Sequence, residues 1–555
     1  MRCIRNGQFL LVITLGLSFG AWGRSGSVQA GRGAAVQGAA AQQAGPPGSA
    51  AGRGGRGGGG GGGGTGFYNY DTTASSGIPI PDAPPAETHQ KITVNGEALA
   101  YTARAGHMPL RNATTGQSAA HLFFTYYARD GVSDASARPV MFFLGGAPGV
   151  AAGWQEFGGL GPKRMKWAAD GTPGLPPYGW VDNPYTLLGQ ADLVFVNPVG
   201  TAFSRPDQPG RGPDFWTTAT DIASLGEFVR SFLNNYNRRN SPLFLAGEDF
   251  GTARAAGLAG YLIEHQIPVD GVVLLSMTPA ADALAGDEQY LTLLPSVVMA
   301  AWYHKKLAPE LQALGAEQIA EQARQFAARE YLRTLYKGDR MTSEERTKVV
   351  ANLSRLTGLS KAFIVNNDLR ITLARFTPEL LRDQRRALSN SDARVTGYVP
   401  GSSGGGRGGF GGGGGVAAID YNQINLAGGF LTAYEAYLRR ELTFAGSGSI
   451  YYLLSGGIGT FTSSGSDDAS LAGLFVRNPR LHLFVGVNFF DLNAPFYATE
   501  FTLSHLNVSP EVRAHNITVS HYEAGQMAYL DNKALAKLHS DLARFINEAI
   551  SPARQ

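Results

Sequence analysis

Short apolar runs alternate with amphipathic segments along most of this 555-residue chain. An apolar run of a few residues is typical of a strand, and apolar positions repeating every three or four residues are typical of a helix. Strands are predicted at residues 98–103, 121–129, 140–144, 193–196, 243–246, 272–275, 481–487 and 517–522. Helical periodicity between them, as at 217–235 and 254–265, predicts an α/β fold with a mostly parallel sheet covered on both faces.

Residues 280–450 follow a different pattern. They are rich in Ala, Glu, Arg and Leu at helical spacing, notably at 316–336 and 344–356, and show no clear strand. We interpret this block as a helical cap inserted between two strands of the sheet. A last helix, at 533–550, closes the core.

Two glycine-rich tracts interrupt the pattern. Residues 31–66 are mostly Gly, Ala, Gln and Arg, and residues 401–415 are mostly Gly. Neither tract can bury enough apolar surface to offset the entropy cost of ordering it, so we expect a tether and a surface loop. The predicted organisation is a signal peptide at 1–30, a linker at 31–75, the first part of the core at 76–279, the cap at 280–450 and the second part of the core at 451–555.

The N-terminus has the pattern of an export signal. Arg2 and Arg5 precede an apolar run at 9–22, and a small-x-small cleavage site follows at 28–30. The alternative is a membrane anchor, but the run is shorter than the roughly 20 residues that a span needs. Cys3 is the only cysteine and would be removed on cleavage. We therefore expect a secreted or periplasmic protein with no disulfide and no stable membrane insertion.

Composition excludes several function classes. The chain is 43% hydrophobic and 16% charged with a net charge of +3, and its basic residues do not run together with aromatics. Nucleic-acid binding is therefore not expected. The ten histidines lack the spacing of a metal-binding helix, and no Gly-rich turn carries the Lys-Ser/Thr of a phosphate loop. We expect neither a metal nor another cofactor.

The most informative local feature is the sequence Leu-Phe-Leu-Ala-Gly-Glu-Asp-Phe-Gly at 243–251. A predicted strand runs into Gly-x-Asp-x-Gly, and a helix of small residues follows. This is the form of a nucleophile elbow, in which a tight strand-to-helix turn exposes the central side chain. The usual central residue is Ser, whereas here it is Asp249. Taken alone, the motif fits equally well an ordinary turn in which Asp caps the helix.

Further segments resemble the serine carboxypeptidase family, in order and at plausible spacing from about residue 90 to 550. The matching segments are PVMFFLGGAPGVAA (139–152), LGP (160–162), NPY (183–185), ADLVFVNPVGTAFSR (191–205), LFLAGEDFG (243–251), FFDLNAPFYATEF (489–501) and YEAGQM (522–527). The resemblance implies an α/β-hydrolase fold with a helical cap insertion.

The resemblance also assigns roles to individual positions. Asp491 falls on the family's catalytic Asp, and Glu248 falls on a Glu that helps to bind the substrate's terminal carboxyl group. The positions that differ from the family are Asp249 for the nucleophilic Ser, Gln526 for the catalytic His and Gly145 for the substrate-binding Asn. The backbone donors of the oxyanion hole correspond to Ala147 and Phe250.

Those differences remove the chemistry of serine hydrolysis. The reaction needs a hydroxyl nucleophile and a base that accepts its proton. Gln526 has no nitrogen that titrates near neutral pH, and Asp249 cannot form an acyl-serine ester. Residual catalysis would be only roughly 10³–10⁴ over water. We predict negligible peptidase activity.

Other functions stay open. Asp249 could attack carbon directly, as carboxylates do in some α/β-hydrolases, but that reaction also needs a histidine, and the nearest in sequence are His521 and His505. An active peptidase with an unidentified triad, or a structural protein with the cap as its interaction surface, are further alternatives. The Gly-x-Ser-x-Gly at 401–405 has no strand before it and lies in the glycine tract.

The substitutions also change the charge of the expected cleft. Glu248, Asp249 and Asp491 would place up to three carboxyl groups in one pocket without the family's histidine. Like charges in a shared site raise the pKa of at least one member. The function that we predict is an exported, catalytically inactive homologue that binds peptides or small molecules in the old active-site cleft. The sequence does not predict an oligomeric state.

Overall fold

The computed structural model describes residues 80–551, except residues 81, 95, 113, 147–148, 169–170, 278–285, 400–419, 445, 447–449, 455–457 and 459–470. The described residues belong to the unit 67–555, one of two units into which internal contacts divide the chain. The predicted signal peptide, the predicted linker and the glycine-rich loop at 401–415 lie outside the described residues.

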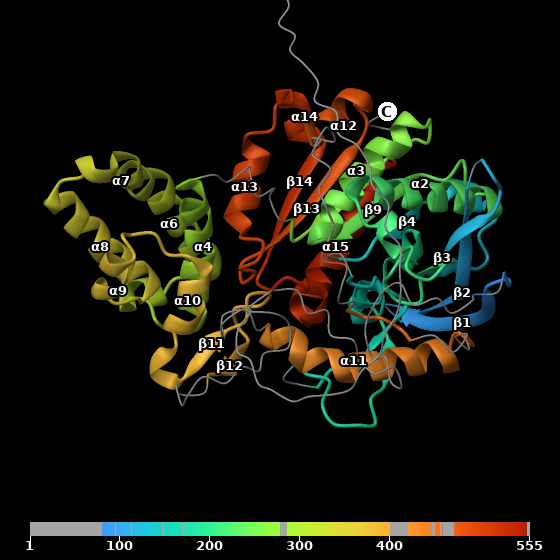
Figure 1. Cartoon of the computed structure of the whole chain (residues 1–555), viewed down its shortest axis with the longest axis horizontal. Helices are drawn as coiled ribbons and strands as arrows, with labels where there is room; N and C mark the ends of the chain where they lie inside the picture. The colour runs from blue at the N-terminus through green and yellow to red at the C-terminus, as the bar shows by residue number, and fades with distance from the viewer. Residues whose placement is uncertain are drawn as a thin grey trace, which may run out of the picture. The chain divides into compact units, whose positions relative to one another are not determined.

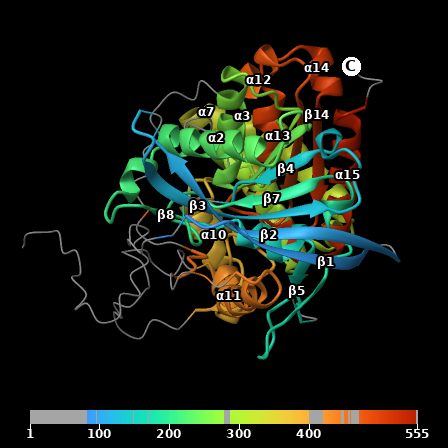
Figure 2. The same ribbon diagram turned by 90° about the vertical axis from the view of Figure 1, so that its right-hand side faces the viewer.

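A ten-stranded sheet forms the centre of this unit (Figures 1 and 2). Its order is β1-β2-β3-β7-β4-β9-β10-β13-β14, and β8 pairs with β3. The strands are β1 (Ala86–Val94), β2 (Glu97–Arg111), β3 (Ser118–Arg129), β4 (Val140–Phe143), β7 (Asp192–Val196), β8 (Arg205–Pro206), β9 (Leu243–Glu248), β10 (Gly271–Leu275), β13 (His482–Asn488) and β14 (Ile517–Tyr522). Every pair from β7 to β14 is parallel, and β1, β2, β3 and β7 pair antiparallel. The predicted α/β class with a mostly parallel sheet is confirmed.

Alternating side chains fill a separate core on each face of the sheet. Phe142 of β4 packs with the helices α2 (Thr218–Asn235) and α3 (Phe250–Glu264). Its neighbour Phe143 belongs to the other core, with α11 (Tyr421–Arg440) and α15 (Asn532–Ala549). Because successive residues of a strand point to opposite faces, a central strand that is apolar throughout requires both layers.

The remaining elements are short or belong to the chain between β10 and β13. They are α1 (Gly153–Gln155), β5 (Lys163–Met165), β6 (Trp180–Asp182), α4 (Glu288–Tyr303), α5 (Pro309–Gln312), α6 (Ala316–Phe326), α7 (Leu332–Lys337), α8 (Ser343–Thr357), α9 (Lys361–Asn366), α10 (Leu373–Glu379), β11 (Arg386–Leu388), β12 (Thr396–Tyr398), α12 (Leu471–Arg477), α13 (Phe496–Ser504) and α14 (Pro510–His515). Figure 1 shows α6–α10 gathered beside α4, to one side of the sheet.

One detail of the predicted cap is wrong. The block at 280–450 contains an antiparallel pair, β11–β12, which the sequence did not reveal because each strand has only three residues. The helix predicted at 316–336 is present as α6 and α7, which a π-helical stretch, Ala327–Tyr331, joins without a break. None of the helices in the described part has the length and apolar character that a membrane span requires.

Candidate active site

Asp249 stands at the turn between β9 and α3, in a strained backbone conformation. Its φ is 54° and its ψ is −126°, values that side-chain-bearing residues rarely adopt. The turn is fixed by hydrogen bonds, since Asp249 N donates to Leu275 O (3.0 Å) and Thr252 N donates to Asp249 O (3.0 Å). The backbone therefore has the form of the predicted elbow, although the central residue is an aspartate.

Glycines on either side of Asp249 make this turn possible. A Cβ atom at Gly247 would lie 1.8 Å from Gly251 O, and one at Gly251 would lie 2.0 Å from Gly145 O. Both distances are far below a van der Waals contact. The two elbow glycines are thus required by close approach of the backbone, and Gly251 also brings the start of α3 against the loop after β4.

Adjacent parallel strands bring the predicted positions to one edge of the sheet. Asp249 follows β9, Asp491 follows β13 and Gln526 follows β14, while β10 lies between β9 and β13. The carboxyl ends of parallel strands lie at the same edge, where open α/β sheets bind their ligands. Asp249 directly follows Glu248, and the charge of Asp249 adds to the raised pKa of both Glu248 and Asp491.

Asp491 is fully buried. Its Oδ1 accepts hydrogen bonds from Asn493 N (2.9 Å) and Ala494 N (3.1 Å), and its Oδ2 has no hydrogen-bond partner among the described residues. Burial, reinforced by the charge of Asp249, raises the pKa of Asp491 well above its usual range. Asp491 therefore sits in an environment that disfavours its ionised form.

Glu248, the last residue of β9, is only 4% exposed. Tyr529 Oη donates to its Oε2 (2.7 Å), and its Oε1 finds no donor within the described part of the chain. Burial raises the pKa of Glu248 to about 8, and the charges of Asp249 and Asp491 add to that rise. Tyr529 is a site residue that the sequence analysis missed, because nothing in the motif marks a tyrosine three positions after Gln526.

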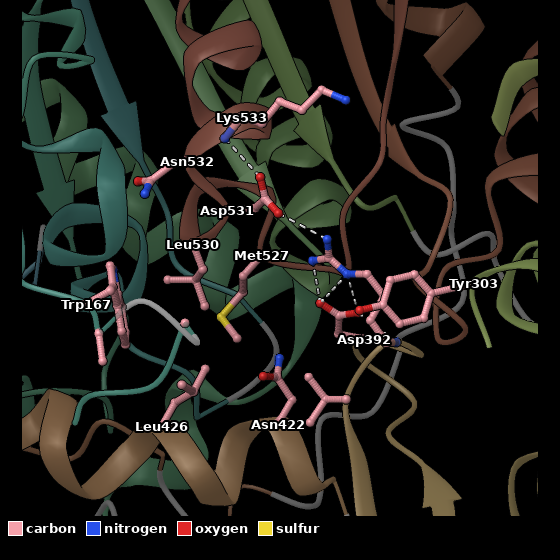
Figure 3. A pocket seen from close by; sticks show the side chains of 14 residues that line it. Trp167, Tyr303, Asp392, Asn422, Leu426, Met527, Leu530, Asp531, Asn532 and Lys533 are labelled. Atoms are coloured by element: carbon pink, nitrogen blue, oxygen red, sulfur yellow. Dashed lines mark hydrogen bonds and ion pairs between the residues drawn. The ribbon is translucent and has the colours of Figure 1, made fainter. Parts of the chain in front are cut away.

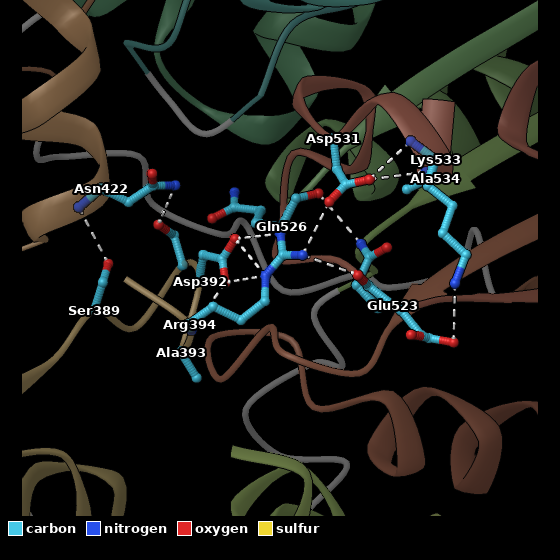
Figure 4. A network of polar contacts seen from close by, with 12 residues as sticks. Ser389, Asp392, Ala393, Arg394, Asn422, Glu523, Gln526, Asp531, Lys533 and Ala534 are labelled. Atoms are coloured by element: carbon cyan, nitrogen blue, oxygen red, sulfur yellow. Dashed lines mark hydrogen bonds and ion pairs between the residues drawn. The ribbon is translucent and has the colours of Figure 1, made fainter. Parts of the chain in front are cut away.

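The backbone of Gln526 is held from two sides. Its N–H donates to Ser391 O (2.7 Å), while its carbonyl oxygen accepts from Ser276 Oγ (2.9 Å) and Asn488 Nδ2 (3.2 Å). Ser276 directly follows β10 and Asn488 ends β13, so two strands of the core fix the loop after β14. Ser391 belongs to the chain between β11 and β12, and Figure 4 shows this segment next to Gln526.

The loop after β4 corresponds in part to the predicted oxyanion hole. Gly145 has a φ of +72°, and its N–H donates to Gln155 Oε1 (3.2 Å). Arg254 of α3 supports the loop, because its Nη1 donates to Leu144 O (3.1 Å) and Gly146 O (3.0 Å). Phe250 begins α3 directly after the elbow, whereas Ala147 lies outside the described residues.

Both candidate replacement histidines have one ring nitrogen engaged by another group. His521 Nε2 lies 2.5 Å from Glu500 Oε1 and 3.3 Å from Arg324 Nη2, an interaction that joins β14 to α13 and α6. His505 is exposed at the end of α13, where its Nδ1 lies 2.8 Å from Phe501 O. In each ring one nitrogen is thus engaged by a group other than Asp249.

A charged network beside Gln526 also escaped the sequence analysis (Figure 4). Arg394 binds both carboxylate oxygens of Asp392, with contacts of 2.9 Å and 2.7 Å, and its Nη1 donates to Asp531 Oδ2 (3.0 Å) and Glu523 O (3.0 Å). Leu492 N also donates to Asn390 O (2.9 Å). The segment 390–394 therefore ties together the loops that carry Asp491 and Gln526.

A cavity of about 590 Å³ opens beside the same segment. Figure 3 shows Trp167 and Tyr303 on opposite sides of it, with Leu426 and Asn422 of α11 and with Met527, the neighbour of Gln526. The lining combines aromatic faces with charged and amide groups. Such a cavity is large enough for a small ligand or a few residues of a peptide.

Comparisons with known proteins agree with this geometry. A family model described as serine carboxypeptidase matches residues 95–327. The retinoid-inducible serine carboxypeptidases of Rattus norvegicus and Mus musculus are 27% and 30% identical over 168 and 145 residues, which is 30% and 25% of this chain. The matched stretches span only 34% and 28% of those relatives.

A solved structure extends the likeness over most of the described chain. Kex1(Δ)p, a prohormone-processing carboxypeptidase from Saccharomyces cerevisiae, superposes with a TM-score of 0.52 at 14% identity, over 80% of this chain and 91% of that one. At that identity the match supports the fold alone. The chain is therefore similar to serine carboxypeptidases over residues 95–327, and its described part has the α/β-hydrolase fold.

Proposed function

We propose that this chain is an exported, catalytically inactive serine carboxypeptidase-like protein that binds peptides or related small molecules at the carboxyl edge of its sheet. One observation carries the proposal. The strained elbow and the buried Asp491 are both present, while the two positions that would exchange a proton hold Asp249 and Gln526. Export is proposed from the N-terminal pattern of two arginines, an apolar run and a small-x-small site.

The chemistry of these two side chains argues against turnover. A carboxamide cannot accept the proton of an attacking hydroxyl or return it to a leaving group. The alternative in which Asp249 attacks carbon leaves an ester, and a base is needed to hydrolyse it. His521 Nε2 and His505 Nδ1 are engaged by Glu500 and by the carbonyl of Phe501, so those two nitrogens do not serve as that base.

The surroundings favour binding over a purely structural role. Glu248 and Asp491 are buried polar groups whose hydrogen-bonding capacity is only partly used by the described residues. A cavity of about 590 Å³ also lies beside Gln526, with Met527 in its wall. Buried carboxyl groups of this kind are costly to stability, and functional sites are where such costs are commonly retained.

The test is restoration of the lost chemistry. The wild type and the double variant Asp249→Ser with Gln526→His are incubated with a mixed library of N-blocked peptides from pH 4 to 7.5, and release of C-terminal residues is measured. We expect release by the double variant only. The single variants Asp249→Ser and Gln526→His are the matched controls, and both should stay inactive because nucleophile and base act as a unit.

Each other outcome is informative. Release by the wild type would mean that another nucleophile is at work and that the inactive assignment is wrong. A covalent ester on Asp249, detected by mass spectrometry of the wild type with substrate, would favour the Asp-nucleophile alternative. If the double variant folds, binds peptides and yet releases nothing, the assignment of Asp249 and Gln526 to the family's positions fails.

A further inference from the structure

A second cavity, of about 720 Å³, lies next to the cavity described above. The two share part of their walls, including Tyr303 and Lys533 (Figure 3). The rest of the second wall comes from the ends of α4 and β14, the loop after β13, α6 and α15. We propose that this second cavity binds an organic anion with an aromatic body, such as an aromatic carboxylate. The proposal goes beyond the proposed function, because Asp249, Asp491 and Gln526 do not line this cavity.

Five aromatic side chains line the second cavity: Trp302, Tyr303, Phe489, Phe490 and Tyr522. Phe489 and Phe490 are buried beneath it, whereas Tyr303 is 43% exposed and Trp302 is partly exposed. The rings of Tyr303 and Phe490 meet edge to face, with their centroids 5.4 Å apart. Ring faces and edges pack well against a further aromatic ring, so the cavity suits a flat apolar body.

The carboxyl groups that line the second cavity each have a cation beside them. Asp531 accepts a hydrogen bond from Arg394 (3.0 Å), and Glu523 lies 3.5 Å from Lys533 (Figure 4). The charge of Glu317 acts on the arginine of its own helix, α6. The acids of this wall are therefore already compensated by the protein.

Lys305 differs from the other cations of the wall. The arginine and the other two lysines pair with acids, as Lys537 does with Asp541 (2.7 Å). Lys305 is exposed just after α4, and its Nζ lies 5.4 Å from the centroid of the Trp302 ring. Within the described part of the chain, that ring is the one partner of the ammonium group. A contact with a ring leaves hydrogen-bond donors of the ammonium unused, so Lys305 can bind an anion.

Other ligand charges fit this cavity less well. A cationic ligand would be repelled by Lys305 and would have to compete for acids that are already paired. His521 does not change this balance, since its Nε2 lies 2.5 Å from Glu500 Oε1. A neutral aromatic ligand would contact the rings and leave the ammonium of Lys305 unused. An anionic group on an aromatic body uses both, with the charge at Lys305 and the ring against Trp302.

Three probes with the same naphthalene body test the preference for an anion: 2-naphthylacetate, the neutral 2-naphthylacetamide and the cationic 2-(2-naphthyl)ethylamine. Titration calorimetry with the full-length protein at pH 7.5 gives each affinity. We expect the acid to bind at least threefold more tightly than the amide, and the amine to bind most weakly. The same chemistry can come from a free acid or from an aromatic residue at the end of a peptide. The affinity of N-acetyl-glycyl-phenylalanine relative to the naphthyl acid decides between these sources.

Variants locate the bound acid in this cavity. Lys305→Gln should weaken binding of the acid at least threefold, to about the affinity of the amide, and should leave the amide unchanged. Trp302→Leu should weaken the acid and the amide alike, because both lose a ring to pack against. Lys306→Gln is the matched control and should change neither affinity. Lys306 is the next lysine along the chain, but it pairs with Asp383 (3.1 Å) and does not line the cavity.

The salt dependence of the wild type is a second readout that needs no variant. Because salt screens charges at an exposed site, 0.5 M NaCl should weaken binding of the acid and leave that of the amide unchanged.

Several outcomes would overturn the inference. They are equal affinity for the acid and the amide, preference for the amine, no binding of the acid, or undiminished binding of the acid by Lys305→Gln. None of them would affect the proposed function, which concerns the elbow and the cavity beside Gln526 and is tested by release of C-terminal residues.

Discussion

At Asp249 the backbone keeps the positive φ of the elbow although no serine is present to use it (φ 54°, ψ −126°). A non-glycine residue held in such a region costs of order 1–3 kcal/mol. Replacing Asp249 with Gly relieves that strain, and replacing it with Ala removes the carboxylate but keeps the strain. We expect the Gly variant to exceed the Ala variant by about 1 kcal/mol in free energy of unfolding, because the greater unfolded-state entropy of Gly offsets part of the gain.

Urea unfolding of the two variants measures this difference. Ala351→Gly within α8 is the control. There Gly should lower the free energy of unfolding by about 1 kcal/mol relative to Ala, because Gly is unfavourable in a helix interior. An Ala variant at position 249 as stable as the Gly variant would show that the turn relaxes without its aspartate.

Single residues of the site differ in how far the sequence predicts them. Asp249 could be placed because a strand and two close glycines define its turn, and the structure brings it near Asp491 as the order of motifs implied. Tyr529 could not be placed, because its contact with Glu248 bridges 281 positions of sequence. Burial of Glu248 likewise depends on packing against residues distant in the sequence, which a local sequence pattern does not predict.

Among the elements, the segment between β11 and β12 is the one that most affects the site. Arg394 joins Asp392 to Asp531, and the exposed fractions of the Arg394 and Asp392 side chains are 20% and 11%. Arg394→Met leaves Asp392 without its counter-charge in a largely buried place. We expect a loss of about 3 kcal/mol in free energy of unfolding, measured by denaturant titration.

The control for Arg394 is an exposed pair elsewhere in the insertion. Arg355→Met breaks the contact with Glu310 (2.8 Å), and it should cost less than about 1 kcal/mol because both side chains are well exposed. The double variant Asp392→Asn with Arg394→Met should recover part of the loss. If Arg394→Met lowers the free energy of unfolding no more than Arg355→Met does, the contacts of Arg394 do not stabilise the loops that carry Asp491 and Gln526.

The same segment shows which elements could not be predicted from the sequence. The core strands were found because each is an apolar run bounded by turns, as at 243–246 and 272–275. The segment 389–395 is small and polar, and it is held by hydrogen bonds to loops about 100 to 140 positions later, such as Gln526 N to Ser391 O. No local periodicity signals contacts of that kind, so the strands of the cap and its role beside Gln526 were missed.

Across the whole molecule, several acids are buried away from arginine and lysine. Glu156 is 2% exposed and accepts hydrogen bonds from Thr125 (2.8 Å), Tyr127 (2.5 Å) and Tyr434 (2.6 Å), which joins β3 to α11. Burial raises the pKa of Glu156 to about 7 despite these donors. With Glu248 and Asp491, the fold thus holds carboxyl protons at several buried sites that no sequence pattern distinguishes.

These protons determine whether the free energy of unfolding rises or falls with pH. In the unfolded chain the carboxyls ionise near pH 4.5, whereas Glu156 and Glu248 in the folded protein hold their protons to about pH 7 and pH 8. Between these values the folded state binds more protons than the unfolded state, so the free energy of unfolding falls as pH rises. Each such proton contributes a slope of about 1.4 kcal/mol per pH unit.

We therefore expect the midpoint of thermal unfolding to be highest near pH 5 and to fall toward pH 8. Calorimetry at constant ionic strength measures it for the wild type, Glu248→Gln and Glu156→Gln. The Glu248 variant should lose less stability between pH 5 and 8, and the Glu156 variant should lose less mainly between pH 5 and 7, since each lacks one titrating carboxyl. A wild-type midpoint that rises from pH 5 to 8 would show that these carboxyls are ionised in the folded protein.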